Sequence, residues 1–280
     1  MNRIVSCFTN CFGPDGVRAA VESICRTGID HLELALRAHD FGGLVIPESA
    51  VITERATEPE VRAFLDHMDE YGVGVSGCNV GGANMLTAEG LAVTQRRIRF
   101  AHRWFGVKVV VSGAGQPKNH DERLLMLEHL RQVGDTAGEL GITVALETHK
   151  GPTQNAEAML ALMAELNHPS VRINFDTGNI AYYNDGFDPV EELEKVKHLV
   201  SNVHLKDNRG GLGDWYFPAV GDGGAVNFAR VRAVLDEVGF TGPYTIEIEG
   251  IGGEPEPGLP GRAERVARSV AHLRACGYFD

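Results

Sequence analysis

Short runs of apolar and β-branched residues recur along the chain, and each has the length of a strand. Eight such runs lie at 3–9, 30–36, 73–80, 107–113, 142–147, 171–176, 201–206 and 244–249. Between them, apolar residues return every three or four positions, as in 121–140, which is typical of amphipathic helices. Many of these helical stretches end in a glycine just before the next strand, where a helix C-terminus favours positive φ: Gly28, Gly72, Gly106, Gly141 and Gly239. The pattern therefore predicts strands and helices in strict alternation.

This alternation predicts a fold of the α/β class. Strands that are nearly all apolar and separated by helices indicate a parallel sheet covered by helices, and eight such units match a closed (β/α)₈ TIM barrel. We expect residues 1–280 to form one domain, because no Ser/Pro/Gln-rich stretch divides the chain. A doubly wound open sheet is the competing fold, but the G-x-G-x-x-G turn after the first strand is missing.

The amino-acid composition limits the kinds of partner that we expect for this protein. The chain has 26 Lys and Arg against 38 Asp and Glu, a net charge of −12, which disfavours a nucleic-acid partner. No segment approaches the length of a membrane span, and the N-terminus lacks the pattern of a signal peptide, so we expect a cytoplasmic protein without membrane contact. The five cysteines form no C-x-x-C pair, which argues against a disulfide framework or a structural zinc site.

Polar side chains mark the ends of four consecutive strands. The working face of a (β/α)₈ barrel lies at the C-terminal ends of its strands, so these side chains are candidates for chemistry. They are Glu147 and His149 after the fifth strand, Asp176 and Asn179 after the sixth, His204 on the seventh, and Glu247 and Glu249 on the eighth. Any one of them alone is explained as well by a helix cap or a satisfied core residue.

Together, four of these side chains predict a metal site. Two glutamates, one aspartate and one histidine on neighbouring strands are costly to bury unless they are paired or coordinated. Glu147, Asp176, His204 and either Glu247 or Glu249 offer three carboxylate ligands and one imidazole. This set suits Mn²⁺, Mg²⁺ or Co²⁺, with room for two further ligands.

Several segments resemble one family. They are ALETHKG, NFDTGN, VHLKD, GDGGAVNF and GFTGPYTIEIE, and they are similar to the xylose isomerase-like TIM barrels, which include sugar phosphate isomerases/epimerases, ketose 3-epimerases, inosose isomerases and inosose dehydratases. The resemblance implies that Glu147, Asp176, His204 and Glu247 bind one divalent metal ion, with Mn²⁺ favoured over Mg²⁺ and Co²⁺. Glu249 points to the same side of its strand as Glu247 and competes with it for the last ligand position.

The segments depart from the ketose 3-epimerase pattern at two positions. Asn179 stands where those enzymes usually have a histidine three residues after the aspartate. Arg209 follows His204 by five residues, whereas their sugar-binding arginine follows by six. The HLKD sequence, with Lys206 and Asp207, looks more like the inosose dehydratase and general isomerase branches. These departures leave the substrate open.

The predicted site indicates a mechanism. A substrate with a carbonyl beside a hydroxyl would chelate the metal, and Glu147 and Glu247 would remove and return a proton through an enediolate. His149 and Lys206 are candidates for orienting or polarising substrate oxygens. We therefore predict an enzyme, a metal-dependent sugar or cyclitol isomerase or epimerase. The runner-up is an inosose-type dehydratase that eliminates a β-hydroxyl at the same site.

Other predictions concern the substrate and its surroundings. Further candidates for substrate contact are Trp215, in a glycine-rich insertion after the seventh strand, Glu33, at the end of the second, and Asn179 and Arg209. Lys206 and Asp207 are expected beside His204. No glycine-rich phosphate cradle is present, which favours a free sugar or cyclitol. Remote alternatives are a non-catalytic sugar-binding module and a nuclease similar to AP endonucleases. The sequence leaves a homo-oligomer open.

Overall fold

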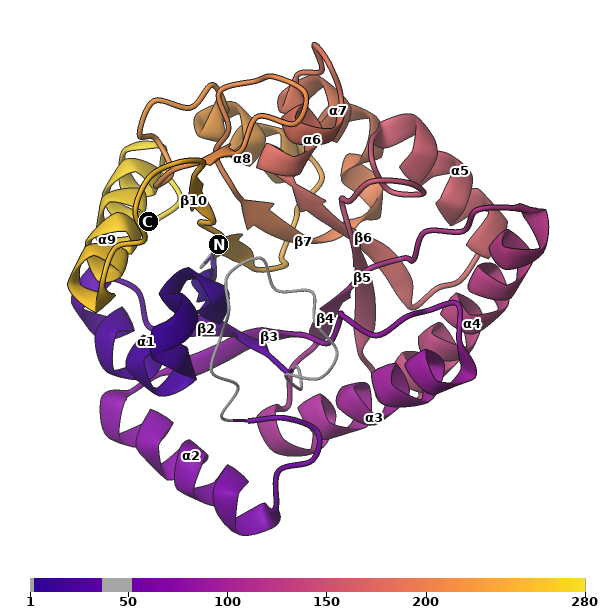
Figure 1. Ribbon diagram of the computed structural model, residues 1–280, viewed down its shortest axis with the longest axis horizontal. Helices are drawn as coiled ribbons and strands as arrows, with labels where there is room; N and C mark the ends of the chain where they lie inside the picture. The colour runs from indigo at the N-terminus through magenta and orange to yellow at the C-terminus, as the bar shows by residue number, and fades with distance from the viewer. Residues whose placement is uncertain (1–2, 37–51, 280) are drawn as a thin grey trace.

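Eight parallel strands close into one barrel in the computed structural model, which describes residues 3–36 and 52–279 (Figure 1). The strands follow one another in chain order, and the last pairs with the first. They are β1 Val5–Phe8, β2 His31–Ala35, β3 Gly74–Asn79, β4 Val109–Ser112, β5 Thr143–Glu147, β6 Val171–Asp176, β7 Val200–Leu205 and β9 Tyr244–Ile246. Each predicted run overlaps one of these strands, and the prediction of a (β/α)₈ barrel is confirmed.

Helices surround the barrel (Figure 1). They are α1 Gly16–Ile24, α2 Glu58–Tyr71, α3 Ala88–Phe105, α4 His120–Glu139, α5 Ala156–Leu166, α6 Thr177–Tyr183, α7 Pro189–Val196, α8 Phe228–Glu237 and α9 Leu259–Ala275. Gly72 and Gly106 end α2 and α3 with φ of 65° and 61°, the left-handed conformation that the sequence predicted for them. No helix in the described ranges is long and apolar enough to cross a membrane.

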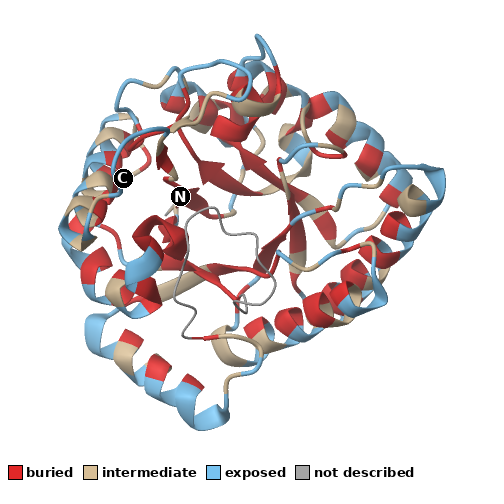
Figure 2. Cartoon of the chain, in the orientation of Figure 1, coloured by how far each residue is buried: buried red, intermediate tan, exposed pale blue. Residues whose placement is uncertain are grey.

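On β6 and β7, an apolar outer face alternates with a polar inner face. On β7, Val203 and Leu205 belong to the large core between strands and helices, whereas Asn202 and His204 face the barrel interior, where both contact Glu33 from β2. Figure 2 shows the strands buried and the outer faces of the helices exposed. Because side chains alternate along a strand, packing against the helices also directs polar groups inward.

The insertion after β7 contains a strand that the sequence did not predict. Residues Tyr216–Phe217 form β8, which pairs antiparallel with β10, Gly250–Ile251, beyond the last barrel strand. The backbone N–H of Gly252 also donates to the carbonyl of Trp215 at 2.7 Å. Two-residue strands carry no periodic signal, so the sequence pattern predicted only a loop here.

Asp207 organises the same insertion. Its carboxylate accepts hydrogen bonds from the backbone N–H groups of Asn208 at 3.0 Å, Gly221 at 2.9 Å and Val226 at 3.4 Å. The expectation that Asp207 lines the pocket beside His204 is therefore wrong, because both of its oxygens face the loop backbone. The residue is a tether for the loop between β7 and α8.

Gly224→Ala is expected to destabilise this loop. A Cβ at Gly224 would lie 1.9 Å from Oδ1 of Asp207, so the carboxylate would have to move and lose backbone hydrogen bonds. We expect a loss of about 1–3 kcal/mol in the free energy of unfolding, measured by urea denaturation. The matched control is Gly113→Ala, where the added Cβ meets no atom within 4 Å. Equal stability of the two variants would contradict the tether.

Candidate metal centre

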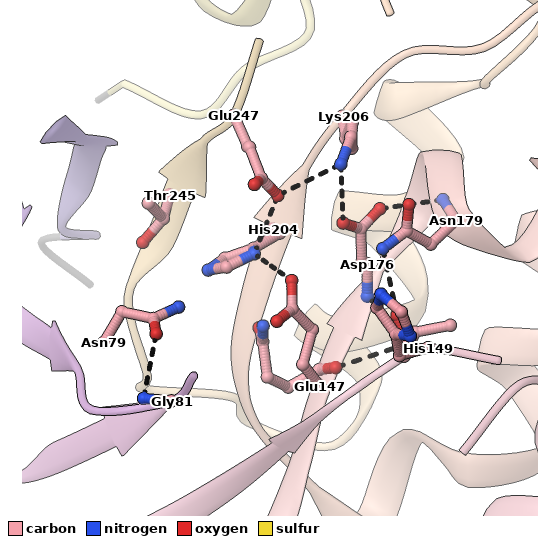
Figure 3. Close-up of polar contacts among 12 residues, drawn as sticks. Asn79, Gly81, Glu147, His149, Asp176, Asn179, His204, Lys206, Thr245 and Glu247 are labelled. Carbon is pink, nitrogen blue, oxygen red and sulfur yellow. Dashed lines mark hydrogen bonds and ion pairs between the residues drawn. The ribbon is translucent and has the colours of Figure 1, made fainter. Parts of the chain in front are cut away.

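Four side chains meet at the C-terminal mouth of the barrel. Glu147 ends β5, Asp176 ends β6, His204 lies on β7, and Glu247 follows β9. One potential ligand atom from each lies within 4.8 Å of the others, and Figure 3 shows the side chains pointing toward one another. The structure therefore brings together the four residues that the sequence singled out as metal ligands.

Unpaired atoms within this cluster fit a divalent cation. Nδ1 of His204 lies 3.3 Å from Oε1 of Glu147 and 3.0 Å from Oε2 of Glu247. Yet Nδ1 of His204, Oε2 of Glu247 and Oδ2 of Asp176 are buried and make no hydrogen bond of acceptable geometry. Buried polar atoms without partners are costly, and convergent ligand atoms of this kind are what a metal ion requires. The donor set therefore fits an oxygen-preferring divalent ion.

The two carboxylate oxygens of Asp176 have different roles: one caps a helix, and the other faces the cluster. Oδ1 accepts hydrogen bonds from the backbone N–H groups of Gly178 and Asn179, both at 2.9 Å, and so caps the N-terminus of α6. Oδ2 is left for the cluster. The cap fixes the carboxylate in one orientation, because two backbone donors hold one oxygen. The helix cap and the proposed ligand are thus the same side chain.

Lys206 supplies positive charge beside the cluster. Its Nζ lies 2.6 Å from Oε2 of Glu249, 3.5 Å from Oε2 of Glu247 and 3.6 Å from Oδ2 of Asp176, and only 2% of the side chain is exposed. Burial alone would lower the pKa of Lys206, but these three carboxylates raise it well above its ordinary value. The carboxylates therefore favour the charged form of Lys206, and Glu249 is its nearest partner.

The pKa shifts within the cluster follow from burial and from the neighbouring charges. Burial raises the pKa of Asp176 well above its usual range, and Lys206 offsets this only in part. For Glu147 and Glu247 burial acts in the same direction, but His204 and Lys206 outweigh it and lower both pKa values. Burial opposes the charged form of His204, yet the surrounding glutamates raise its pKa well above the usual value. The cluster thus attracts positive charge.

A cavity of about 90 Å³ opens on the cluster. Its wall combines carboxylates, amides and aromatic rings, namely Phe8, Asn10, Asn79, Glu147, His149, Asn179, Tyr182, Tyr183, Lys206, Trp215, Phe217, Glu247 and Glu249. Such a mixture is typical of small-molecule sites in which a few polar groups orient the ligand.

Four of the predicted substrate-contact residues line this cavity. Lys206 is one of them. His149 accepts or donates a 3.0 Å hydrogen bond with the hydroxyl of Tyr183, and Asn179 donates from Nδ2 to the carbonyl of Thr148 at 2.9 Å. Trp215 packs edge-on against the rings of Tyr182 and Phe217. Their contact with a substrate remains a prediction.

Two other predicted positions lie outside the cavity wall. Arg209 forms an exposed pair with Asp214, with Nε 2.5 Å from Oδ2, and its guanidinium stacks over the ring of Tyr216. Glu33 is fully buried beneath His204, on the side away from the cavity. The structure therefore does not bring these two side chains to the cavity: Arg209 pairs within its own loop, and Glu33 lies one layer deeper in the barrel. Their contact with a substrate stays a prediction.

Sequence reasoning missed several residues of the cavity wall. Asn10 comes from the segment after β1, and Tyr182 and Tyr183 come from α6. The two tyrosines stand six and seven residues after Asp176, so the short helix that Asp176 caps carries them to the mouth. The only available signal was this adjacency to the DTGN segment.

The closed barrel and the four convergent ligand candidates at its C-terminal mouth place this chain among (β/α)₈ proteins with a candidate divalent-metal site. Residues 21–276 match the model of one family, described as the xylose isomerase-like TIM barrel. The chain belongs to this family.

Individual relatives extend the comparison. L-ribulose-5-phosphate 3-epimerase UlaE of Salmonella typhi is 30% identical over 170 residues, which cover 58% of this chain and 57% of that protein. The match thus spans little more than half of the relative. A xylose isomerase-like TIM barrel protein from Mycobacterium smegmatis, solved in complex with magnesium, has a TM-score of 0.74 at 19% identity and covers 99% of this chain and 98% of that one. An L-ribulose 3-epimerase has a TM-score of 0.73 at 14% identity, with 99% and 94% covered. At such identities the structural matches show the fold.

Proposed function

We propose that the protein is a divalent-metal-dependent isomerase or epimerase that acts on a sugar or cyclitol carrying a carbonyl beside a hydroxyl. The observation that carries this proposal is the approach of two carboxylates, Glu147 and Glu247, to one point beside His204. Two carboxylates around one site can remove a proton from carbon and return it elsewhere. The names of the relatives, L-ribulose-5-phosphate 3-epimerase and L-ribulose 3-epimerase, support this class of reaction.

The metal in this proposal is one divalent ion, with Mn²⁺ favoured and Mg²⁺ or Co²⁺ as alternatives. Glu147, Asp176, His204 and Glu247 would hold it, because their ligand atoms are the ones that converge. When bound, the ion would act as a Lewis acid that polarises the carbonyl and stabilises the negative charge developing on its oxygen.

The side chains perform the proton transfers. His204 and Lys206 lower the pKa values of Glu147 and Glu247 and so favour the ionised carboxylates, the form that accepts a proton. One of them removes the proton next to the carbonyl, and the other returns a proton to the opposite face of that carbon or to its neighbour. Lys206, held by Glu249, is placed to polarise a substrate oxygen.

The aromatic wall suits a carbohydrate. Trp215, Tyr182 and Phe217 pack against one another beside the cavity and offer apolar surface to the C–H faces of a sugar ring or chain. Asn179 and His149 supply polar atoms on the same wall. Apolar rings with a few polar groups are the usual composition of a small-molecule site.

A dehydratase is the second candidate, and the position of Lys206 favours it. A buried ammonium at the cavity wall could donate a proton to a departing β-hydroxyl, after the same abstraction step that starts isomerisation. The two reactions differ in their products. Isomerisation and epimerisation keep the oxygen atoms of the substrate, whereas dehydration releases one molecule of water.

Metal analysis with proton exchange tests the proposal. We expect about one Mn²⁺, Mg²⁺ or Co²⁺ ion per wild-type chain by mass spectrometry, and its loss in His204→Ala, since the imidazole ligand is removed. The loaded protein should exchange carbon-bound hydrogen of a ketose, ketose phosphate or inosose with D₂O, as followed by NMR. Loss of water from the substrate would instead favour the dehydratase. A wild type that binds no metal, or a His204→Ala variant that binds as well as wild type, would overturn the proposal.

A further inference from the structure

Glu33 is a buried carboxylate that the proposed proton transfers do not use. It lies on β2, and none of its surface is exposed. Both of its oxygens face Nε2 of His204, at 3.1 Å from Oε1 and 3.2 Å from Oε2. A carboxyl group at such depth requires hydrogen-bond donors as partners. His204 is the one ionisable side chain within salt-bridge distance of Glu33 in the described part of the chain.

The other contacts of Glu33 come from neutral donors. Oε2 also accepts hydrogen bonds from Nδ2 of Asn202 at 3.3 Å and from the hydroxyl of Thr245 at 3.2 Å. The hydroxyl of Thr245 lies in turn 2.9 Å from that of Ser6 on β1. Strands β1, β7 and β9 therefore hold Glu33 in place below the ring of His204.

The two nitrogens of His204 face opposite partners. Nε2 faces Glu33, whereas Nδ1 faces Glu147 and Glu247 in the candidate metal centre. The ring of Phe8 stacks on the imidazole at a centroid distance of 5.8 Å and an interplanar angle of 22°, which restricts its tilt. A hydrogen bond from one ring nitrogen determines which nitrogen keeps its lone pair for a ligand.

We infer that Glu33 is a positioning residue that holds His204 with its Nε2–H toward the barrel interior and its Nδ1 lone pair toward the metal. The inference rests on the proposed metal site and adds one residue to it. A carboxylate behind a metal-binding histidine fixes the ring orientation and strengthens the nitrogen as a ligand. Glu33 thus acts through His204 and touches neither metal nor substrate.

Glu33→Gln tests this role. The amide keeps the size of the side chain but weakens the acceptor that faces Nε2, and we expect the dissociation constant for Mn²⁺ to rise about 10–100-fold, measured by isothermal titration calorimetry. The matched control is Glu54→Gln, which alters another buried carboxylate, one that pairs with Arg97 at 3.2 Å and lies outside the metal cluster. We expect the control to change stability and to leave Mn²⁺ affinity within about twofold of wild type.

The outcomes separate this inference from the proposed function. If wild type binds Mn²⁺ and Glu33→Gln binds it equally well, the positioning role is wrong and the metal site stands. If wild type binds no metal, the proposed function fails and the inference falls with it.

A measurement on wild type keeps the test decisive if Glu33→Gln does not fold. ¹⁵N NMR of the Mg²⁺-loaded protein reports which nitrogen of His204 is protonated. We expect a hydrogen on Nε2 of His204 and none on its Nδ1. A hydrogen on Nδ1 would overturn the inference.

Discussion

Glu147→Gln and Glu247→Gln are each expected to lower kcat by about 10²–10⁴-fold, the usual contribution of a positioned general base. Glutamine retains an oxygen that can bind a metal ion and occupies almost the same volume, but it cannot take a proton. Because both glutamates approach the same nitrogen of His204, both are close to the point where a substrate would lie. The measurement is turnover of the substrate found by the exchange screen.

Exchange of the carbon-bound proton with D₂O shows whether two carboxylates or only one acts as a base. For an epimerase with bases on opposite faces, each variant should still exchange the carbon-bound proton of one epimer with D₂O and lose exchange with the other. The control is Glu139→Gln on the exposed end of α4, which should retain wild-type kcat. If both variants lose exchange with both epimers equally, the division of labour between Glu147 and Glu247 is wrong.

Lys206→Met is expected to cost about 3–5 kcal/mol of unfolding free energy in the metal-free protein. Lys206 contacts Asp176, Glu247 and Glu249, and the apolar side chain would leave these buried carboxylates without that cation. Removing one partner of a buried ion pair leaves the other charge uncompensated, which is why the cost exceeds that of a surface pair. Urea denaturation in the presence of a chelator measures it.

The double variant Lys206→Met/Glu249→Gln is the matched control. Glu249 lies closest to Nζ, at 2.6 Å, so neutralising it as well should recover part of the lost stability. Additive losses in a double-mutant cycle would show that the two side chains do not interact energetically. A loss below about 1 kcal/mol in Lys206→Met would place the pair with ordinary surface ion pairs.

The sequence predicted the barrel and the four convergent side chains because both depend on local patterns. Apolar outer positions alternate with inner ones along each strand, and parallel strands end on the same face, so Glu147, Asp176 and His204 had to meet at the mouth. How deep a side chain lies within the barrel cannot be predicted from such local patterns. Glu33 and Glu247 both belong to strand-end segments, yet one lies below His204 and the other beside it.

The side-chain partners formed within loops could not be predicted from the sequence either. Arg209 matched a sugar-binding position only approximately, and the structure pairs it with Asp214, five residues away in the same loop. Nothing in the periodicity distinguishes an arginine that faces a cavity from one that closes a loop. Tyr182 and Tyr183 were missed for a similar reason, since α6 is too short for its face to be assigned from sequence.

The pairing of β8 with β10 has a consequence for protein engineering. Backbone hydrogen bonds join the segment that carries Trp215 to the segment that follows Glu249, so the two loops form a single exchangeable module. A graft that transplants only residues 207–227 from a relative would leave one strand of this two-stranded sheet without its native pairing partner. Recombination libraries should therefore inherit both segments from the same parent.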